Sequence, residues 1–211
     1  MAISAEDVMR LRDRTGAGVM DCKRALTESG GDFERAADWL RRQGLITAAR
    51  KASRSARDGV IASYIHHGSK LGVLVEVNCE TDFVARTEDF TGLARDLAIQ
   101  VAGMNPEYVD RDQVPADVLE EKRREFAAEA EREGRPADRV SAIVEGRLNK
   151  WLESACLLEQ QYRDTDRTVR DLVNEKIALL GENIRVARFV RMAVGETPEE
   201  PVIELATAEV A

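Results

Sequence analysis

The chain has 211 residues, of which 44% are hydrophobic, 33% charged and 5% aromatic. This apolar share can fill a core and excludes wholesale disorder, and the length allows one or two domains. The net charge of −8 and the scarcity of aromatic rings argue against a protein whose partner is nucleic acid.

The N-terminal sequence and the cysteine content indicate a cytoplasmic protein. The first residues lack the features of a signal peptide, and no apolar run approaches the roughly 20 residues that cross a membrane. The three cysteines, Cys22, Cys79 and Cys156, are far apart and are expected to be reduced thiols. Only two histidines, His66 and His67, are present, which leaves no His-rich metal site. We expect no metal, no cofactor and no membrane contact.

Residues 1–45 predict a small bundle of three amphipathic helices. The predicted helices span residues 4–14, 19–29 and 33–43. Ser4 and Asp32 are suitable N-caps for the first and third helices, and Gly44 is expected to end the third. The basic segment 46–58 is interpreted as a linker.

An alternating pattern typical of β-strands follows the linker. Residues 59–66 and 71–78 predict a hairpin of two largely buried strands, with its turn at residues 67–70. Residues 183–194 predict a third strand. The residues that its alternation places on one face are Ile184, Val186, Val190 and Met192.

Helices account for most of the remaining chain up to residue 195. They are expected at residues 87–102 and 168–180. Two charged helices around a break at residues 134–136 predict an antiparallel helical hairpin at about 117–150 that projects from the body. The prediction is an α+β fold, in which residues 59–195 form a small three-stranded antiparallel sheet packed with helices and a protruding antiparallel coiled coil. The acidic tail, 196–211, is expected to be mobile.

The sequence contains no motif of a known catalytic or nucleotide-binding site. There is no nucleophile elbow, Walker A loop or dinucleotide fingerprint. Gly16 and Gly18 lie between two predicted helices and mark a turn. His66 and His67 lie at a predicted hairpin tip, where solvated turn residues are expected.

The segment 79–86 departs from the pattern of an exposed loop, because Phe83 and Val84 are apolar. One interpretation is that Phe83 folds back onto the core while Thr81 caps a helical turn. The other is that Phe83, beside the carboxylate of Asp82, is a rigid anchor that inserts into a pocket of a partner.

Three stretches of the chain resemble the bacterial elongation factor Ts family. Residues 11–26 (LRDRTGAGVMDCKRAL) and 31–40 (GDFERAADWL) resemble the N-terminal module of that family. Residues 75–86 (VEVNCETDFVAR) resemble its second signature. Thr168-Val169 and residues 188–195 (RFVRMAVG) resemble the C-terminal core. The resemblance covers residues 3–195 and is weakest at 104–140.

The resemblance implies a guanine-nucleotide exchange factor, not an enzyme, with elongation factor Tu in its GDP-bound and nucleotide-free forms as partner. It implies a ubiquitin-associated-like N-terminal bundle that docks on the GTPase domain of that partner. The positions that match this contact region are Arg12, Val19 and Met20.

In the family, a Thr-Asp-Phe-Val loop intrudes beside the nucleotide site and disturbs the magnesium ion. The matching residues are Thr81, Asp82, Phe83 and Val84. His67 and Gly68 lie in a tip that resembles a partner contact of longer members. This chain has room for only one set of three strands, so we expect two copies to pair through their core domains.

Two other functions remain open at this point. The first is a helical binding adaptor whose N-terminal module recognises some other protein and whose 79–86 loop is structural. The second is an enzyme that uses Cys79 or the two histidines.

Overall fold

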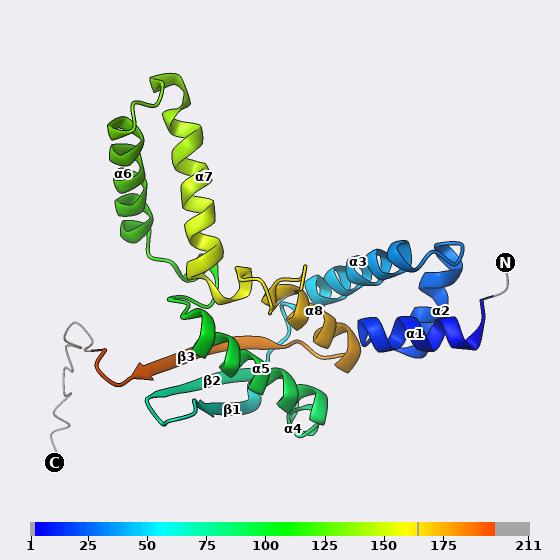
Figure 1. Ribbon diagram of the computed structural model, residues 1–211. Helices are drawn as coiled ribbons and strands as arrows, with labels where there is room; N and C mark the ends of the chain where they lie inside the picture. The colour runs from blue at the N-terminus through cyan, green and yellow to red at the C-terminus, as the bar shows by residue number, and fades with distance from the viewer. Residues whose placement is uncertain (1–2, 164, 197–211) are drawn as a thin grey trace, which may run out of the picture.

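The computed structural model of the chain describes residues 3–163 and 165–196 (Figure 1). The predicted acidic tail lies outside the described residues except for Glu196, so its mobility stays a prediction. Within the described part, no helix combines the length and apolarity that a membrane span requires.

Three helices form the predicted bundle at the N-terminus. They are α1 (Ala5–Thr15), α2 (Val19–Glu28) and α3 (Phe33–Lys51). The side chains of Ser4 and Asp32 accept hydrogen bonds from the backbone N–H groups of Asp7 and Arg35, which confirms both N-caps. The helices enclose a separate cluster of buried residues: Val8, Leu11, Cys22, Ala25, Leu26 and Ala36. The likeness to a ubiquitin-associated domain stays a prediction.

The expectation that Gly44 ends the third helix is wrong. α3 continues to Lys51, so residues 46–51 of the predicted linker are helical. α3 packs against α8 (Val169–Leu180), and Gly44 is buried where the two helices meet. This tertiary contact outweighs the cost of about 1 kcal/mol that glycine carries inside a helix. The division into units 1–45, 46–58 and 59–195 stays a prediction.

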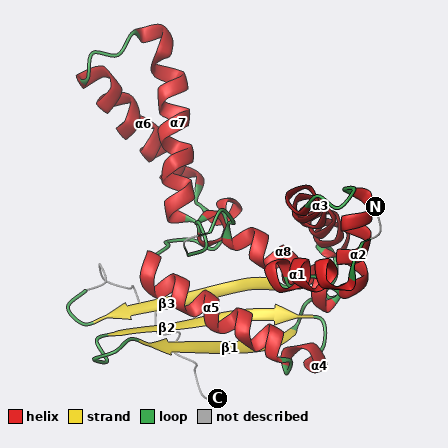
Figure 2. Cartoon of the chain, turned by 45° about the vertical axis from the view of Figure 1, so that its right-hand side comes forward, coloured by secondary structure: helices red, strands yellow, loops and turns green. Residues whose placement is uncertain are grey.

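The sheet has the predicted three antiparallel strands in the order β1-β2-β3. They are β1 (Asp58–Ile65), β2 (Leu71–Cys79) and β3 (Arg185–Ala193). Helix α5 (Glu88–Met104), capped by Thr87 as predicted, crosses one face of the sheet (Figure 2). α5, α8 and this face share the main core.

The opposite, outer face of the sheet carries exposed apolar side chains. The prediction that both hairpin strands are largely buried holds for β2, of which Leu74 is the one exposed residue, and is wrong for β1, where exposed residues alternate with half-buried ones. In the described part of the chain, helices pack on only one face of the sheet (Figure 2). We call the other surface the outer sheet face, and its exposed apolar residues are Ile61, Ile65, Leu74, Val190 and Met192.

A β-bulge in β3 overturns the predicted face of that strand. Val77 pairs with Val186 while Glu76 pairs with Arg188, so Ala187 is an extra residue in the ladder. One extra residue reverses the alternation that follows it. Consequently Val186 is buried, whereas Met192 is exposed on the outer sheet face.

The predicted helical hairpin is present as α6 (Ala116–Arg132) and α7 (Ala137–Ala155), and it projects away from the sheet (Figure 1). Two 3₁₀ turns, η1 (Arg111–Gln113) and η2 (Leu157–Glu159), lie at its base. Arg147 forms ion pairs with Glu129 and Glu133 across the two helices. Whether the hairpin is a regular coiled coil stays a prediction.

Candidate partner-binding site

The segment after β2 is a short helical turn that presents one aromatic ring to solvent. α4 (Asp82–Ala85) begins at Thr81, whose hydroxyl accepts a hydrogen bond from the backbone N–H of Val84 at 3.4 Å. Val84 is buried, and Phe83 is 80% exposed. The predicted cap at Thr81 is therefore confirmed, but Phe83 does not fold back onto the core. Val84 and Ala85 are the residues of α4 that pack into the core.

Hydrogen bonds from a distant part of the chain hold this turn. Glu182, in the loop between α8 and β3, accepts from the backbone N–H groups of Glu80 and Thr81 and from the Thr81 hydroxyl. Sequence reasoning missed Glu182 because it lies about a hundred residues from α4, and no local pattern links the two segments. Asp82 pairs with Arg86 at 2.7 Å, but both side chains are exposed, so the pair adds little stability.

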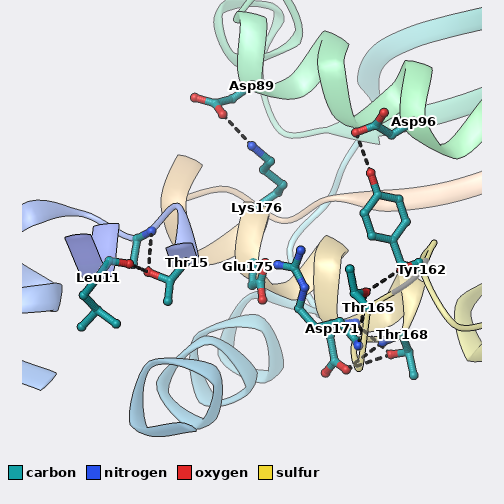
Figure 3. Close-up of polar contacts among 12 residues, drawn as sticks. Leu11, Thr15, Asp89, Asp96, Tyr162, Thr165, Thr168, Asp171, Glu175 and Lys176 are labelled. Atoms are coloured by element: carbon teal, nitrogen blue, oxygen red, sulfur yellow. Dashed lines mark hydrogen bonds and ion pairs between the residues drawn. The ribbon is translucent and has the colours of Figure 1, made fainter. Parts of the chain in front are cut away.

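Polar contacts also connect α8 and the segment before it with α5. Figure 3 shows Lys176 of α8 reaching Asp89 of α5, with Nζ 2.6 Å from Oδ1. The Tyr162 hydroxyl donates to Asp96 of α5 at 3.0 Å, and burial together with this bond raises the pKa of Tyr162 to about 12. These contacts join α8 and the segment before it to α5.

The predicted docking residues of the N-terminal bundle are on its surface. Arg12 lies on α1, and Val19 and Met20 lie in the first turn of α2. All three side chains are exposed, and Met20 is 71% accessible. The bundle and α4 lie toward the same end of the sheet (Figures 1 and 2).

The predicted tip residues lie at the other end of the sheet. His67 and Gly68 belong to the β1–β2 turn, and both are exposed. α4 follows the opposite end of β2, roughly 25–30 Å away for a nine-residue strand. The structure therefore separates the predicted contacts into three patches and does not gather them into one pocket.

The environment of the cysteines does not favour a catalytic thiol. All three cysteines are buried free thiols, and burial raises the pKa of Cys79 and of Cys156 to about 11. A thiol with so high a pKa is a poor nucleophile. Within residues 3–163 and 165–196, no group of His, Cys, Asp and Glu side chains could hold a metal ion.

Exposed apolar residues on a rigid support are typical of a protein that binds another protein. Comparison with known sequences shows to which family of protein-binding proteins the chain is similar. The profile of the family described as Elongation factor TS matches residues 45–196. The chain is 56% identical over 195 residues to Elongation factor Ts of Moorella thermoacetica, covering 92% of this chain and 96% of that protein.

Two further relatives agree. Elongation factor Ts of Geobacter metallireducens is 53% identical over 197 residues, covering 93% of this chain and 91% of that protein. The protein of the same name from Caldanaerobacter subterraneus is 53% identical over 199 residues, covering 94% of this chain and 100% of that protein. The chain belongs to the elongation factor Ts family. This membership confirms the predicted resemblance and favours an elongation factor over the adaptor and the enzyme.

Proposed function

We propose that this chain acts in the cytoplasm as the guanine-nucleotide exchange factor of elongation factor Tu. It promotes GDP release by placing Phe83 beside the nucleotide site of that GTPase. The observation that carries the proposal is the 80% exposure of this ring at the tip of a turn whose backbone is fixed on both sides. Family membership supplies the partner.

The four residues of the Thr-Asp-Phe-Val segment divide into two roles. Val84 anchors α4 in the core, and Thr81, although exposed, uses its hydroxyl within the chain to cap α4 and to bind Glu182. Asp82 and Phe83 are exposed. In this proposal Phe83 is the apolar wedge, and Asp82 offers its carboxylate to a neighbouring helix of the partner.

The chemistry of the partner's magnesium ion explains why a small wedge is sufficient. Mg²⁺ demands a nearly ideal octahedral shell and bridges the protein to the nucleotide phosphates. A small displacement of its surroundings therefore weakens nucleotide binding. By linkage, bound nucleotide weakens the binding of the exchange factor by the same factor.

The N-terminal bundle supplies docking in this scheme. Arg12, Val19 and Met20 present a basic group and two apolar groups on one small module, which suits a protein surface. His67 and Gly68 form a second, distant contact. Docking at both ends of the sheet would hold Phe83 against the nucleotide site.

We also propose that two copies of the chain pair through the outer sheet face. Its apolar residues lie in adjacent rows of the ladder, with Ile65, Gly72 and Met192 in one row and Leu74 beside Val190 in the next. A contiguous exposed apolar face of this kind is typical of an interface.

The substitution Phe83→Ala tests the exchange mechanism. We expect stimulated release of labelled GDP from elongation factor Tu to fall about 30-fold, because a central aromatic anchor contributes about 2 kcal/mol or more. The unfolding midpoint should not change, since the ring is solvated in the free protein. Met104→Ala, at an exposed position at the far end of α5, is the control and should keep full activity. Unchanged GDP release by Phe83→Ala would contradict the wedge mechanism.

A further inference from the structure

The connection between β2 and α4 is held by one carboxylate from the α8–β3 loop. Glu182 Oε2 accepts from the backbone N–H of Glu80 at 3.0 Å and of Thr81 at 3.1 Å. Its Oε1 accepts from the Thr81 hydroxyl at 2.7 Å. Both carboxylate oxygens are therefore used, and a single side chain satisfies three donors.

The bond to the hydroxyl decides how Thr81 caps α4. Because Thr81 Oγ1 gives its only proton to Glu182, its lone pairs are left to accept the N–H of Val84. α4 has four residues, which is too short to be stable by itself because helix nucleation is unfavourable. The orientation of Phe83 therefore depends on Thr81, and that of Thr81 depends on Glu182.

The contact between the two segments is reciprocal, and we call its residues, Glu80, Glu182 and Asn183, the clamp. Glu80 Oε1 accepts from the backbone N–H of Asn183 at 2.7 Å, in return for the bond that Glu80 gives to Glu182. The Asn183 side chain donates to the backbone oxygen of Arg54 at 2.8 Å, just after α3. The clamp thus joins the end of β2, the loop after α8 and the segment that follows the N-terminal bundle.

We propose that Glu182 is a positioning residue for nucleotide exchange, which fixes Thr81 so that α4 presents Phe83 in a defined direction. This inference rests on the proposed function of Phe83. The carboxylate is required because glutamine has one acceptor oxygen in place of two, and its amide would direct N–H groups at donors. A preorganised anchor binds without the loss of conformational entropy that a mobile one incurs.

The test compares Glu182→Gln with the unaltered full chain in two assays. Amide hydrogen exchange should be at least tenfold faster at Glu80, Thr81 and Val84 in the variant. The maximal rate of stimulated GDP release should fall at least tenfold. The concentration that gives half-maximal stimulation should change less than threefold, because the N-terminal bundle still docks.

Two further variants separate positioning from stability. Asp89→Asn removes the ion pair between α5 and Lys176 of α8, the helix that precedes Glu182, so it perturbs α8 without touching the clamp. It should keep the maximal rate. Thr81→Val should lower the maximal rate as Glu182→Gln does, and the double variant should be little worse than either, because both changes remove the hydrogen bond through which Glu182 orients the cap of α4.

Three results would overturn the inference. The first is an unchanged maximal rate in Glu182→Gln despite faster amide exchange. The second is an equal loss of rate in Asp89→Asn, which would indicate a purely structural role. The third, should Glu182→Gln fail to fold, is full activity in Thr81→Val. Failure of the proposed function itself is seen separately, as full activity in Phe83→Ala.

Discussion

At the scale of single residues, neighbours in the same segment have opposite environments. Phe83 and Val84 are both apolar and adjacent, yet the first is 80% exposed and the second is buried. The helical turn of α4 produces this difference, because consecutive residues of a helix point in directions about 100° apart. An apolar residue held outward at this position is consistent with the proposed wedge.

The cysteines give a residue-scale prediction about reactivity. At pH 8 we expect Cys79 and Cys156 to react with iodoacetamide about 100-fold more slowly in the folded chain than in urea. The reason is that burial raises the pKa of each from 9.0 to about 11, which lowers the thiolate fraction accordingly. Alkylation followed by mass spectrometry measures the rate at each site.

The same shifts predict how stability depends on pH. The folded state holds these thiols protonated, so their contribution to the free energy of unfolding is complete below about pH 9. It is lost as the pH rises through about 11. Rapid alkylation of either thiol in the folded protein at pH 8 would show that its burial is not maintained in solution.

At the scale of elements, one helix and one strand differ from the sequence-based prediction because of tertiary structure. α3 runs past Gly44 because α8 covers it, and β3 changes faces at Ala187 because of a bulge. Local propensity describes a segment in isolation, and neither partner element is visible from the segment itself. Both deviations lie next to surfaces for which we propose a function, since α3 leads to the clamp and β3 contributes to the outer sheet face.

Gly44→Ala tests the packing of α3 on α8. A Cβ atom at this position would lie 3.8 Å from the backbone oxygen of Asn174, which is an ordinary contact. We therefore expect the free energy of unfolding to rise by up to about 1 kcal/mol and the melting temperature by about 2–4 °C. Thermal unfolding followed by circular dichroism measures the change.

Gly59→Ala is the contrasting variant. Gly59 has a φ of +149°, and a Cβ there would lie 2.1 Å from the backbone oxygen of Val77. It should destabilise the chain by at least about 2 kcal/mol. If Gly44→Ala were as damaging as Gly59→Ala, the two helices would be closer than the structure places them.

At the scale of the whole molecule, the contacts proposed for the partner and for a second copy lie on different surfaces. The N-terminal bundle and α4 lie toward one end of the sheet, while the outer sheet face lies opposite α5 (Figure 2). Pairing through that face would leave the N-terminal bundle and α4 of each copy free. One dimer could then engage two molecules of elongation factor Tu.

Met192→Glu tests the proposed pairing. Met192 is 72% exposed on the outer sheet face, and a charge there would be buried without a partner in a dimer. We expect the unaltered chain to sediment as a dimer at micromolar concentration and the variant as a monomer. Met20→Glu, at an equally exposed methionine of the N-terminal bundle, should remain dimeric. A purely monomeric unaltered chain would refute the pairing.

The sequence by itself determined the elements and the family. The N-caps at Ser4, Asp32 and Thr87 are confirmed, because a cap depends only on residues within one turn of it. The exposed Phe83 belongs to a signature of twelve consecutive residues, 75–86, which carried the resemblance without any knowledge of the fold.

Only the tertiary structure decided which faces are covered and what holds the site. Glu182 reaches Thr81 across a hundred residues of chain, Gly44 is covered by α8, and the bulge at Ala187 turns Met192 outward. The physical reason is common to all three. Hydrogen bonds and packing between distant segments depend on their relative placement, which local propensity and periodicity do not contain.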